Sequence, residues 1–201
     1  MFTHRQDLQF KSVPEQPDAP YARRLEGVLG GQYNEIGVAM HYMFRSWDMH
    51  VPGMYRDLVF GVGSEQVANI EMLATMIAQL LEHAPSSVLD TAVRLDPAVA
   101  ALIGGTDLQL AIATGAGSSD ANNPWQVASG NVGGNLAADF RTSAAAERDR
   151  RTQLSRLYRL TDDADVQYLL SFLLVRAEAD QRLWRSAAAE LKEGTDHEAA
   201  S

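Results

Sequence analysis

The sequence predicts an all-α protein, a four-helix bundle with one long crossover connection. Apolar side chains recur every three or four residues over four long segments, which is the period of amphipathic helices. About forty residues without that period separate the second segment from the third, which is too long for an ordinary loop. Two helical hairpins joined by one long crossover are the arrangement of ferritin-like bundles, so we expect a fold of that kind.

The first predicted hairpin lies in the N-terminal half and is bounded by glycine and proline residues. The expected segments are a short arm at residues 1–20, a first helix at residues 21–29 and 32–49 that Gly30-Gly31 interrupts, and a second helix at residues 54–84. Pro52-Gly53 separates the two helices, because neither residue favours a helix interior. We therefore expect the first helix to be broken and the second to be continuous.

The second predicted hairpin follows the crossover at residues 85–127. The expected segments are an alanine-rich third helix at residues 128–160, a fourth helix at residues 164–193 and a polar tail at residues 194–201. Asp162 and Asp163 suit the positive end of the dipole of the fourth helix. A chain of 201 residues is the size of one domain, so residues 1–201 are expected to form a single domain.

Composition excludes several classes of protein. The chain has no cysteine, which excludes disulfide scaffolds, thiolate metal sites and cysteine nucleophiles. The net charge of −9 and the pI near 4.9 argue against nucleic-acid binding. The longest uncharged apolar stretches are about half of the roughly 20 residues that a membrane span requires, and residues 1–10 lack the apolar core of a signal peptide. We expect a cytoplasmic protein that binds neither nucleic acid nor membranes.

Histidine placement bears directly on metal binding. Four-helix bundles hold two metal ions with one Glu from each of two helices and a Glu-x-x-His pair from each of the other two. None of the five histidines stands three residues after a Glu, and none lies in the predicted third or fourth helix; they are His4, His41, His50, His83 and His197. For His41 and His50, which bracket the end of the first helix, a solvated or capping role is expected.

Two glutamates could nevertheless supply ligands. Glu35 lies in a segment with few other charges, with Tyr42 on the same helical face, and it fits either a buried functional acid or a surface position. Glu147 follows three alanines and precedes Arg148, Asp149 and Arg150, a context that by itself favours a solvated side chain. The residues alone leave both alternatives open.

Motifs along nearly the whole chain resemble the non-haem dimanganese catalases, a family with a ferritin-like fold. The matching positions are residues 8–10, 14–23, 30–32, 38–40, 42, 44, 46, 47, 52–53, 55–58, 71–77, 124–125, 129–131, 139, 147, 156–158, 161–163, 170–173 and 184. The resemblance implies hydrogen peroxide disproportionation at a dimanganese centre. It also implies a homo-oligomer, with a hexamer as the family assembly.

The departures from the family pattern fall on the metal ligands. The positions that match the family's ligands are Glu35, Gln66, Asn69, Glu147 and Asp180. Gln66 stands where the family has the bridging Glu, and Asn69 and Asp180 stand where it has its two histidines. Glu35 and Glu147 alone are retained as ligands, together with the outer-sphere Tyr42.

These substitutions change the chemistry of the site. An all-oxygen set without imidazoles suits a single hard divalent cation better than a redox-active metal pair. Without any metal, three interior carboxylates repel one another, so at least one should be protonated or paired with an arginine. Water-bridged hydrogen bonds among Glu35, Gln66, Asn69 and Glu147 would be another way to satisfy these groups. The dimanganese centre is therefore expected to be absent or replaced by one divalent cation.

Two functions follow from this expectation. The first is a manganese-catalase-like protein with a degraded site, inactive or weakly active, that has a structural or assembly role. The alternative is functional peroxide disproportionation at an altered metal site that uses Glu35, Glu147 and Asp180. The family activity is predicted to be impaired or lost, no catalytic residue is assigned, and protein partners other than the chain itself are not predicted.

Overall fold

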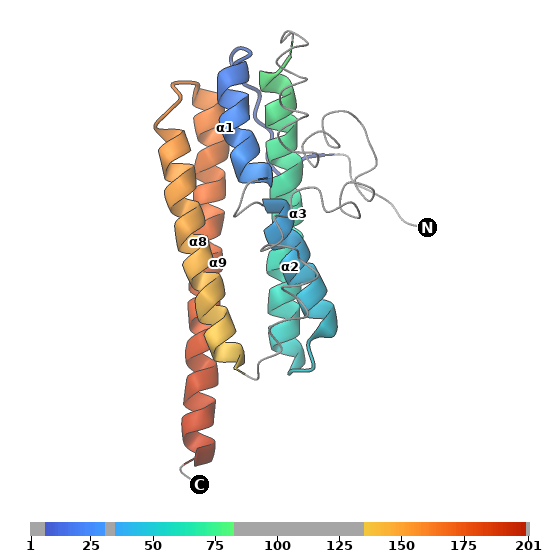
Figure 1. The fold of residues 1–201 in the computed structure, drawn as a ribbon, viewed down its shortest axis with the longest axis vertical. Coiled ribbons are helices and arrows are strands. Elements are labelled where there is room, and N and C mark those ends of the chain that lie inside the picture. The colour runs from blue at the N-terminus through green and yellow to red at the C-terminus, as the bar shows by residue number, and fades with distance from the viewer. Residues whose placement is uncertain (1–6, 31–34, 83–134, 200–201) are drawn as a thin grey trace, which may run out of the picture.

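The described part of the chain is entirely helical. The computed structural model describes residues 7–30, 35–82 and 135–199, and of residues 192–199 it describes the helical backbone only. Within these ranges there is no strand, and the helices are α1 (Ala19–Gly30), α2 (Glu35–Asp48), α3 (Gly53–Leu80), α8 (Leu136–Tyr158) and α9 (Ala164–Ala199) (Figure 1). The predicted all-α class is confirmed. The predicted crossover at residues 85–127 lies outside the described residues.

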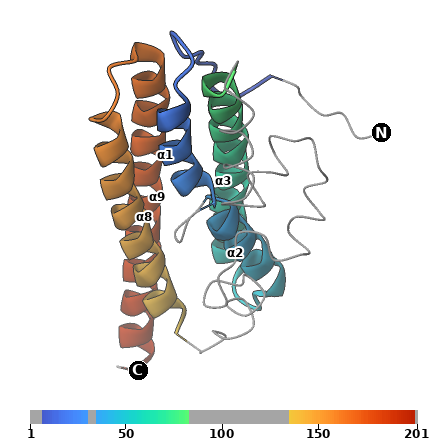
Figure 2. The ribbon, with the colours of Figure 1, turned by 45° about the horizontal axis from the view of Figure 1, so that its top comes forward.

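The helices form two hairpins that lie side by side. In both views α1 and α2 follow one another along α3, while α8 runs along α9 (Figures 1 and 2). The break between α1 and α2 falls after Gly30, where the glycine pair predicts it. Together α1 and α2 act as one interrupted helix, so the described chain builds the four-helix bundle that the sequence predicts.

Three predicted helix ends were wrong. The third predicted helix begins at Leu136 rather than at residue 128, because the side chain of Asn135 accepts a 2.9 Å hydrogen bond from the backbone N–H of Ala138 and caps the helix. α3 ends at Leu80 instead of residue 84. α9 continues through Gly194 to Ala199, so the predicted polar tail is largely helical. One glycine costs a helix only about 1 kcal/mol.

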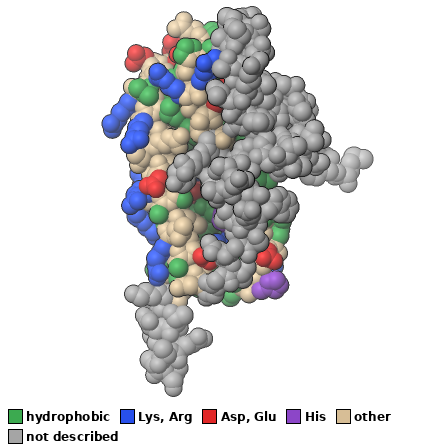
Figure 3. All heavy atoms as spheres, viewed as in Figure 1, with side chains coloured by type: hydrophobic (Ala, Val, Ile, Leu, Met, Phe, Trp, Pro, Cys, Tyr) green, Lys and Arg blue, Asp and Glu red, His purple; other side chains and the backbone are tan. Residues whose placement is uncertain are grey.

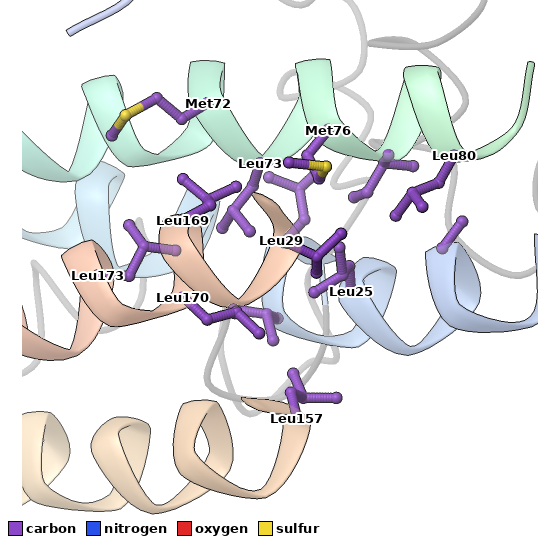
Figure 4. Packing of buried hydrophobic residues seen from close by; sticks show 14 of the residues in the cluster. Leu25, Leu29, Met72, Leu73, Met76, Leu80, Leu157, Leu169, Leu170 and Leu173 are labelled. Atoms are coloured by element: carbon purple, nitrogen blue, oxygen red, sulfur yellow. The ribbon is translucent and has the colours of Figure 1, made fainter. Parts of the chain in front are cut away.

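Two apolar clusters occupy the interior at different levels of the bundle. The larger cluster joins α1, α3, α8 and α9 through leucines and methionines such as Leu29, Leu73 and Leu170, each fully buried (Figure 4). The smaller cluster surrounds Phe140 and Trp184. Along α3 and α9, the residues of the two clusters are separated by buried polar positions. The polar site therefore lies between two apolar layers.

Basic side chains line one edge of the face that Figure 3 draws. Figure 3 shows Lys and Arg side chains along the edge that α8 and α9 form in this view. Among the described helices, none is both long and apolar enough to cross a lipid bilayer.

Candidate metal centre

The structure buries all five residues that match ligand positions of the resembled family. Glu35 comes from α2, Gln66 and Asn69 from α3, Glu147 from α8 and Asp180 from α9, and each residue is at most 1% exposed. The three-residue step from Gln66 to Asn69 places both amides on the same face of α3. Four different helices thus contribute polar groups to the interior.

Arg150 joins two of the buried carboxylates. Its Nε atom lies 2.7 Å from Oε1 of Glu35, and its Nη1 atom donates a 3.0 Å hydrogen bond to Oε2 of Glu147. Arg150 follows Glu147 by three residues, so both side chains lie on the same face of α8. The guanidinium is buried with only 5% of the side chain exposed. A cation of the protein itself therefore contacts both carboxylates.

The contact with Glu35 is incomplete. The N–H of Arg150 Nε does not have hydrogen-bond geometry toward Glu35, and neither oxygen of Glu35 has a hydrogen-bond donor within the described ranges. The attraction between Arg150 and Glu35 is therefore an ion pair without a directed hydrogen bond. Glu35 retains buried lone pairs that another donor or a cation could use.

The two amides form a directional chain of hydrogen bonds. Arg176 donates to Oδ1 of Asn69 at 2.7 Å, Asn69 donates to Oε1 of Gln66 at 2.9 Å, and Gln66 donates to Oδ2 of Asp180 at 3.2 Å. Both amide oxygens accept within this chain, and the chain ends on a carboxylate. Arg176 also bonds Gln9 at 2.7 Å, which connects the chain to the N-terminal arm. Asn69 and Gln66 are thus held by protein contacts.

Burial dominates the electrostatics of the site. It raises the pKa of Glu147 to about 7 against the attraction of Arg150, and it raises the pKa of Asp180 to about 7, with the neighbouring Glu147 acting in the same direction. Burial also raises the pKa of Glu35, while the charge of Arg150 opposes this shift. For Arg150 burial lowers the pKa, but the surrounding carboxylates outweigh burial and raise it. Arg150 therefore remains charged.

Comparisons with known proteins assign the family. The model of the family described as manganese containing catalase matches residues 1–199. A Bacillus subtilis manganese catalase is 40% identical over 195 residues, which are 96% of this chain and 71% of that protein. The uncharacterized protein YjqC of Bacillus subtilis (strain 168) is 43% identical over 196 residues, which are 96% of this chain and 70% of YjqC.

The chain belongs to the manganese catalase family. The crystal structure of KatB, a manganese catalase from Anabaena PCC7120, agrees in fold, with a TM-score of 0.68 and 20% identity over 96% of this chain and 81% of KatB. This agreement confirms the predicted ferritin-like fold. The family uses a dimanganese centre, so the buried residues of this manganese catalase relative can be tested against the donors that such a centre requires.

The residues present do not fit a dimanganese centre. The described residues contain no group of three or more His, Cys, Asp or Glu side chains arranged to hold a metal ion. Within the described ranges no imidazole joins the carboxylates in such a group, although nitrogen donors suit transition metals. In addition, Arg150 contacts both Glu35 and Glu147, and its charge repels any metal cation approaching them.

Other sequence predictions about this region have mixed outcomes. Glu147 is buried, so the solvated position that its charged neighbours favoured is wrong. Arg148 and Asp149 are exposed, whereas Arg150 is buried beside Glu147 and pairs with it. His50 is exposed and its Nδ1 atom lies 2.9 Å from the carbonyl oxygen of Asp48, close to the end of α2, as predicted. His41 is largely buried and its Nδ1 atom has no hydrogen-bond partner within the described chain, which contradicts the predicted solvated or capping role.

The side chains of the remaining histidines lie outside the described part of the structure. His197 falls within the helical bounds of α9, contrary to the prediction that no histidine lies in the fourth helix. His4 and His83 lie outside the described residues.

Two arginines that organise the site, Arg150 and Arg176, were not predicted as site residues. The three interior carboxylates predict an arginine partner but do not identify it. The three-residue step from Glu147 to Arg150 is a signal that could have identified that partner. Arg176 precedes Asp180 by four residues, so it too shares a helical face with a candidate ligand position.

Proposed function

We propose that this chain is a manganese catalase family protein that has lost the dinuclear centre and has a structural or assembly role. The contact of Arg150 with both retained glutamates supports this proposal most strongly. Metal–oxygen bonds to divalent transition metals are only about 2.0–2.2 Å long, so a metal ion bound by these carboxylates would lie next to the guanidinium. The engagement of Gln66 and Asn69 in hydrogen bonds adds support.

Metal content and peroxide turnover test the loss of the centre. The protein is purified from manganese-supplemented cells, and manganese per chain and oxygen release from hydrogen peroxide are measured. We expect less than about one tenth of a manganese ion per chain and no oxygen release above buffer. The Bacillus subtilis manganese catalase, purified in parallel, is the positive control. Close to two manganese ions per chain together with oxygen evolution would contradict the proposal.

Altered peroxide disproportionation is the second candidate function. The observation that favours it is the pair of buried Glu35 oxygens without hydrogen-bond donors in the described chain, which could bind one hard divalent cation. If such a reaction occurs here, Glu35→Ala should abolish it. Turnover that Glu35→Ala leaves unchanged would exclude this site as its source, and the exposed Glu71→Ala serves as the matched control.

We propose a cytoplasmic homo-oligomer, with a hexamer as the state that the family resemblance implies. Large apolar side chains remain exposed on the isolated chain, among them Trp47 at 63% and Met54 at 62%. Contact with further copies would remove such surface from water. Light scattering coupled to gel filtration should give a mass close to six times the 22.0 kDa of one chain. A mass of one chain would contradict this part of the proposal.

A further inference from the structure

Arg150 is an unusual residue for a protein interior. A guanidinium loses its hydration when it is buried, and this loss is compensated only when anionic partners surround it. Here the partners are Glu35 and Glu147, with Asp180 close enough for its charge to act on Arg150. Arg150 thus depends on the same carboxylates that in other members of the family can bind metal.

The carboxylates depend equally on Arg150. Glu35, Glu147 and Asp180 are buried together, and the charge of Glu147 disfavours ionisation of Asp180. Gln66 gives Asp180 one neutral donor, and Glu35 receives no directed hydrogen bond within the described chain. No other arginine or lysine forms an ion pair with Glu35 or Glu147 within the described part. Removal of Arg150 would leave Glu35 and Glu147 without an ion pair in the described chain, and Arg176 would be the remaining arginine whose charge acts on Glu35 and Asp180.

We infer that Arg150 is a tethered counter-cation that takes the place of the bound metal, and that its removal opens a latent site for one hard divalent cation. This inference rests on the proposed function. The ligands would be carboxylate oxygens of Glu35 and Glu147, the two carboxylates that Arg150 contacts, and this chemistry selects Mg²⁺, Ca²⁺ or Mn²⁺. Glu35 supports the latent site independently, because it is 1% exposed and both of its oxygens lack hydrogen-bond donors in the described ranges.

The central experiment compares Arg150→Ala with Arg148→Ala. Arg148 lies on the same helix with 65% of its side chain exposed and pairs with Asp149 at the surface, so it is the matched control. Each protein is freed of metal with EDTA, and its melting temperature is measured with and without MnCl₂, CaCl₂ or MgCl₂. Bound metal is then counted after gel filtration.

We expect Arg150→Ala to melt at least 5 °C below the wild type in EDTA and to recover at least half of that loss with a divalent cation. It should retain about one ion per chain. The wild type and Arg148→Ala should show shifts below about 1 °C and retain less than one tenth of an ion. Equal melting temperatures in EDTA, no response of Arg150→Ala to cations, or equal metal retention by wild type and variant would each overturn the inference.

A second variant covers the case in which Arg150→Ala does not fold. The double variant Glu35→Gln with Arg150→Met removes one charge of each sign and preserves side-chain volume. It should fold in EDTA, melt above Arg150→Met alone and show less cation stabilisation than Arg150→Met. Failure of the double variant to fold would show that the packing of Arg150, rather than its charge, is essential, and would overturn the inference.

The same measurements separate this inference from the proposed function. Two manganese ions in the wild type would refute the proposed loss of the centre. A wild type free of metal, together with an Arg150→Ala variant that does not respond to cations, would refute the inference alone.

Discussion

Two buried carboxylates of the site have opposite surroundings. Glu35 lies 2.7 Å from a guanidinium nitrogen, whereas Asp180 contacts a neutral amide of Gln66 at 3.2 Å. Removing one partner of a buried ion pair destabilises a protein, because the remaining charge loses its compensation. Replacing a buried carboxylate that lacks a cationic partner with an isosteric amide instead removes the cost of burying its charge.

We therefore predict opposite effects for Glu35→Gln and Asp180→Asn at pH 8. Glu35→Gln should lower the free energy of unfolding by about 2 kcal/mol, less than the full loss of a buried pair because Glu147 still contacts Arg150. Asp180→Asn should raise it by about 1 kcal/mol. Urea unfolding measures both changes. A destabilising Asp180→Asn combined with a neutral Glu35→Gln would contradict the charge assignments at this site.

His41 makes stability depend on pH. Burial lowers its pKa to about 4, with Arg45 acting in the same direction and Asp139 opposing it. Since the pKa of histidine in the unfolded chain is about 6.5, the unfolded state binds a proton first as the pH falls. The contribution of neutral His41 is fully present above about pH 6.5 and is lost as the pH falls toward 4.

His41→Phe should weaken this dependence, because phenylalanine keeps a ring beside Tyr42 and cannot bind a proton. Between pH 7 and pH 5 its free energy of unfolding should fall by about 2 kcal/mol less than that of the wild type. Urea unfolding across this pH range checks the difference. The exposed His50→Phe is the control, and an unchanged pH slope in His41→Phe would refute the prediction.

The identities of the site residues could be predicted only in part. The motif positions of Glu35 and Glu147 follow from a linear pattern, and so does the need for a counter-charge near three interior acids. The choice of Arg150 over Arg148 and Arg151 depends on which face of α8 turns inward, and the alanine-rich sequence there gives a weak apolar period. The lowered pKa of His41 depends on its burial and on the charges of Arg45 and Asp139 from two helices, which no local pattern reveals.

At the scale of elements, the sequence predicted what strong local signals specify. The glycine pair at Gly30-Gly31 and the Pro52-Gly53 break mark the limits of α1, α2 and α3. Asp163, which the sequence places before the fourth helix, accepts hydrogen bonds from the backbone N–H groups of Asp165 and Val166 and caps α9. The end of α9 was missed, because Gly194 alone is too weak a signal to stop a long helix.

The hairpin of α2 and α3 depends on a close approach at one glycine. A Cβ atom at Gly63 would lie 3.1 Å from Cβ of Tyr42 and 3.3 Å from the backbone nitrogen of Met43, whereas a Cβ atom at Gly61 would meet nothing within 4 Å. Both glycines lie in the interior of α3, so both replacements gain the same helix propensity, at most about 1 kcal/mol. The difference in stability between the two alanine variants therefore depends on the space available to the added methyl group.

We predict that Gly61→Ala raises the free energy of unfolding by up to about 1 kcal/mol and that Gly63→Ala lowers it by about 1 kcal/mol, since overpacking forces the helices apart. Chemical unfolding of the two variants under identical conditions measures this contrast. Equal stabilisation by both substitutions would show that α2 and α3 do not approach closely at Tyr42.

At the scale of the whole molecule, the bundle isolates its polar site between two apolar layers. The cluster around Leu73 and Leu170 lies on one side, and the cluster around Phe140 and Trp184 lies on the other. Low polarity on both sides strengthens the attraction between Arg150 and its carboxylates and also increases the cost of leaving any of them unpaired. The fold therefore retains a compartment suited to charged groups, whichever cation neutralises them.

Exposed apolar side chains gather near the turn between α2 and α3, where another copy of the chain could bind. Trp47 and Met54 lie on either side of the turn between α2 and α3, and the ring of Phe44 packs edge-on against Trp47 at 5.4 Å. Phe60 on α3 is also exposed, at 44%. Several large apolar side chains near one end of a hairpin favour contact with another copy of the chain, because burial removes their surface from water.

We predict that replacing Trp47 and Met54 together with serine lowers the mass of the assembly measured by light scattering, at protein concentrations where the wild type is oligomeric. Val175 on α9 is 70% exposed and lies on the other hairpin from Trp47 and Met54, so Val175→Ser is the matched control and should leave the mass unchanged. The unfolding transition of each variant is measured in parallel, because both target side chains are exposed and their loss should not unfold the chain. An unchanged mass for the double variant, or a loss of mass with Val175→Ser alone, would place the contact between copies elsewhere on the molecule.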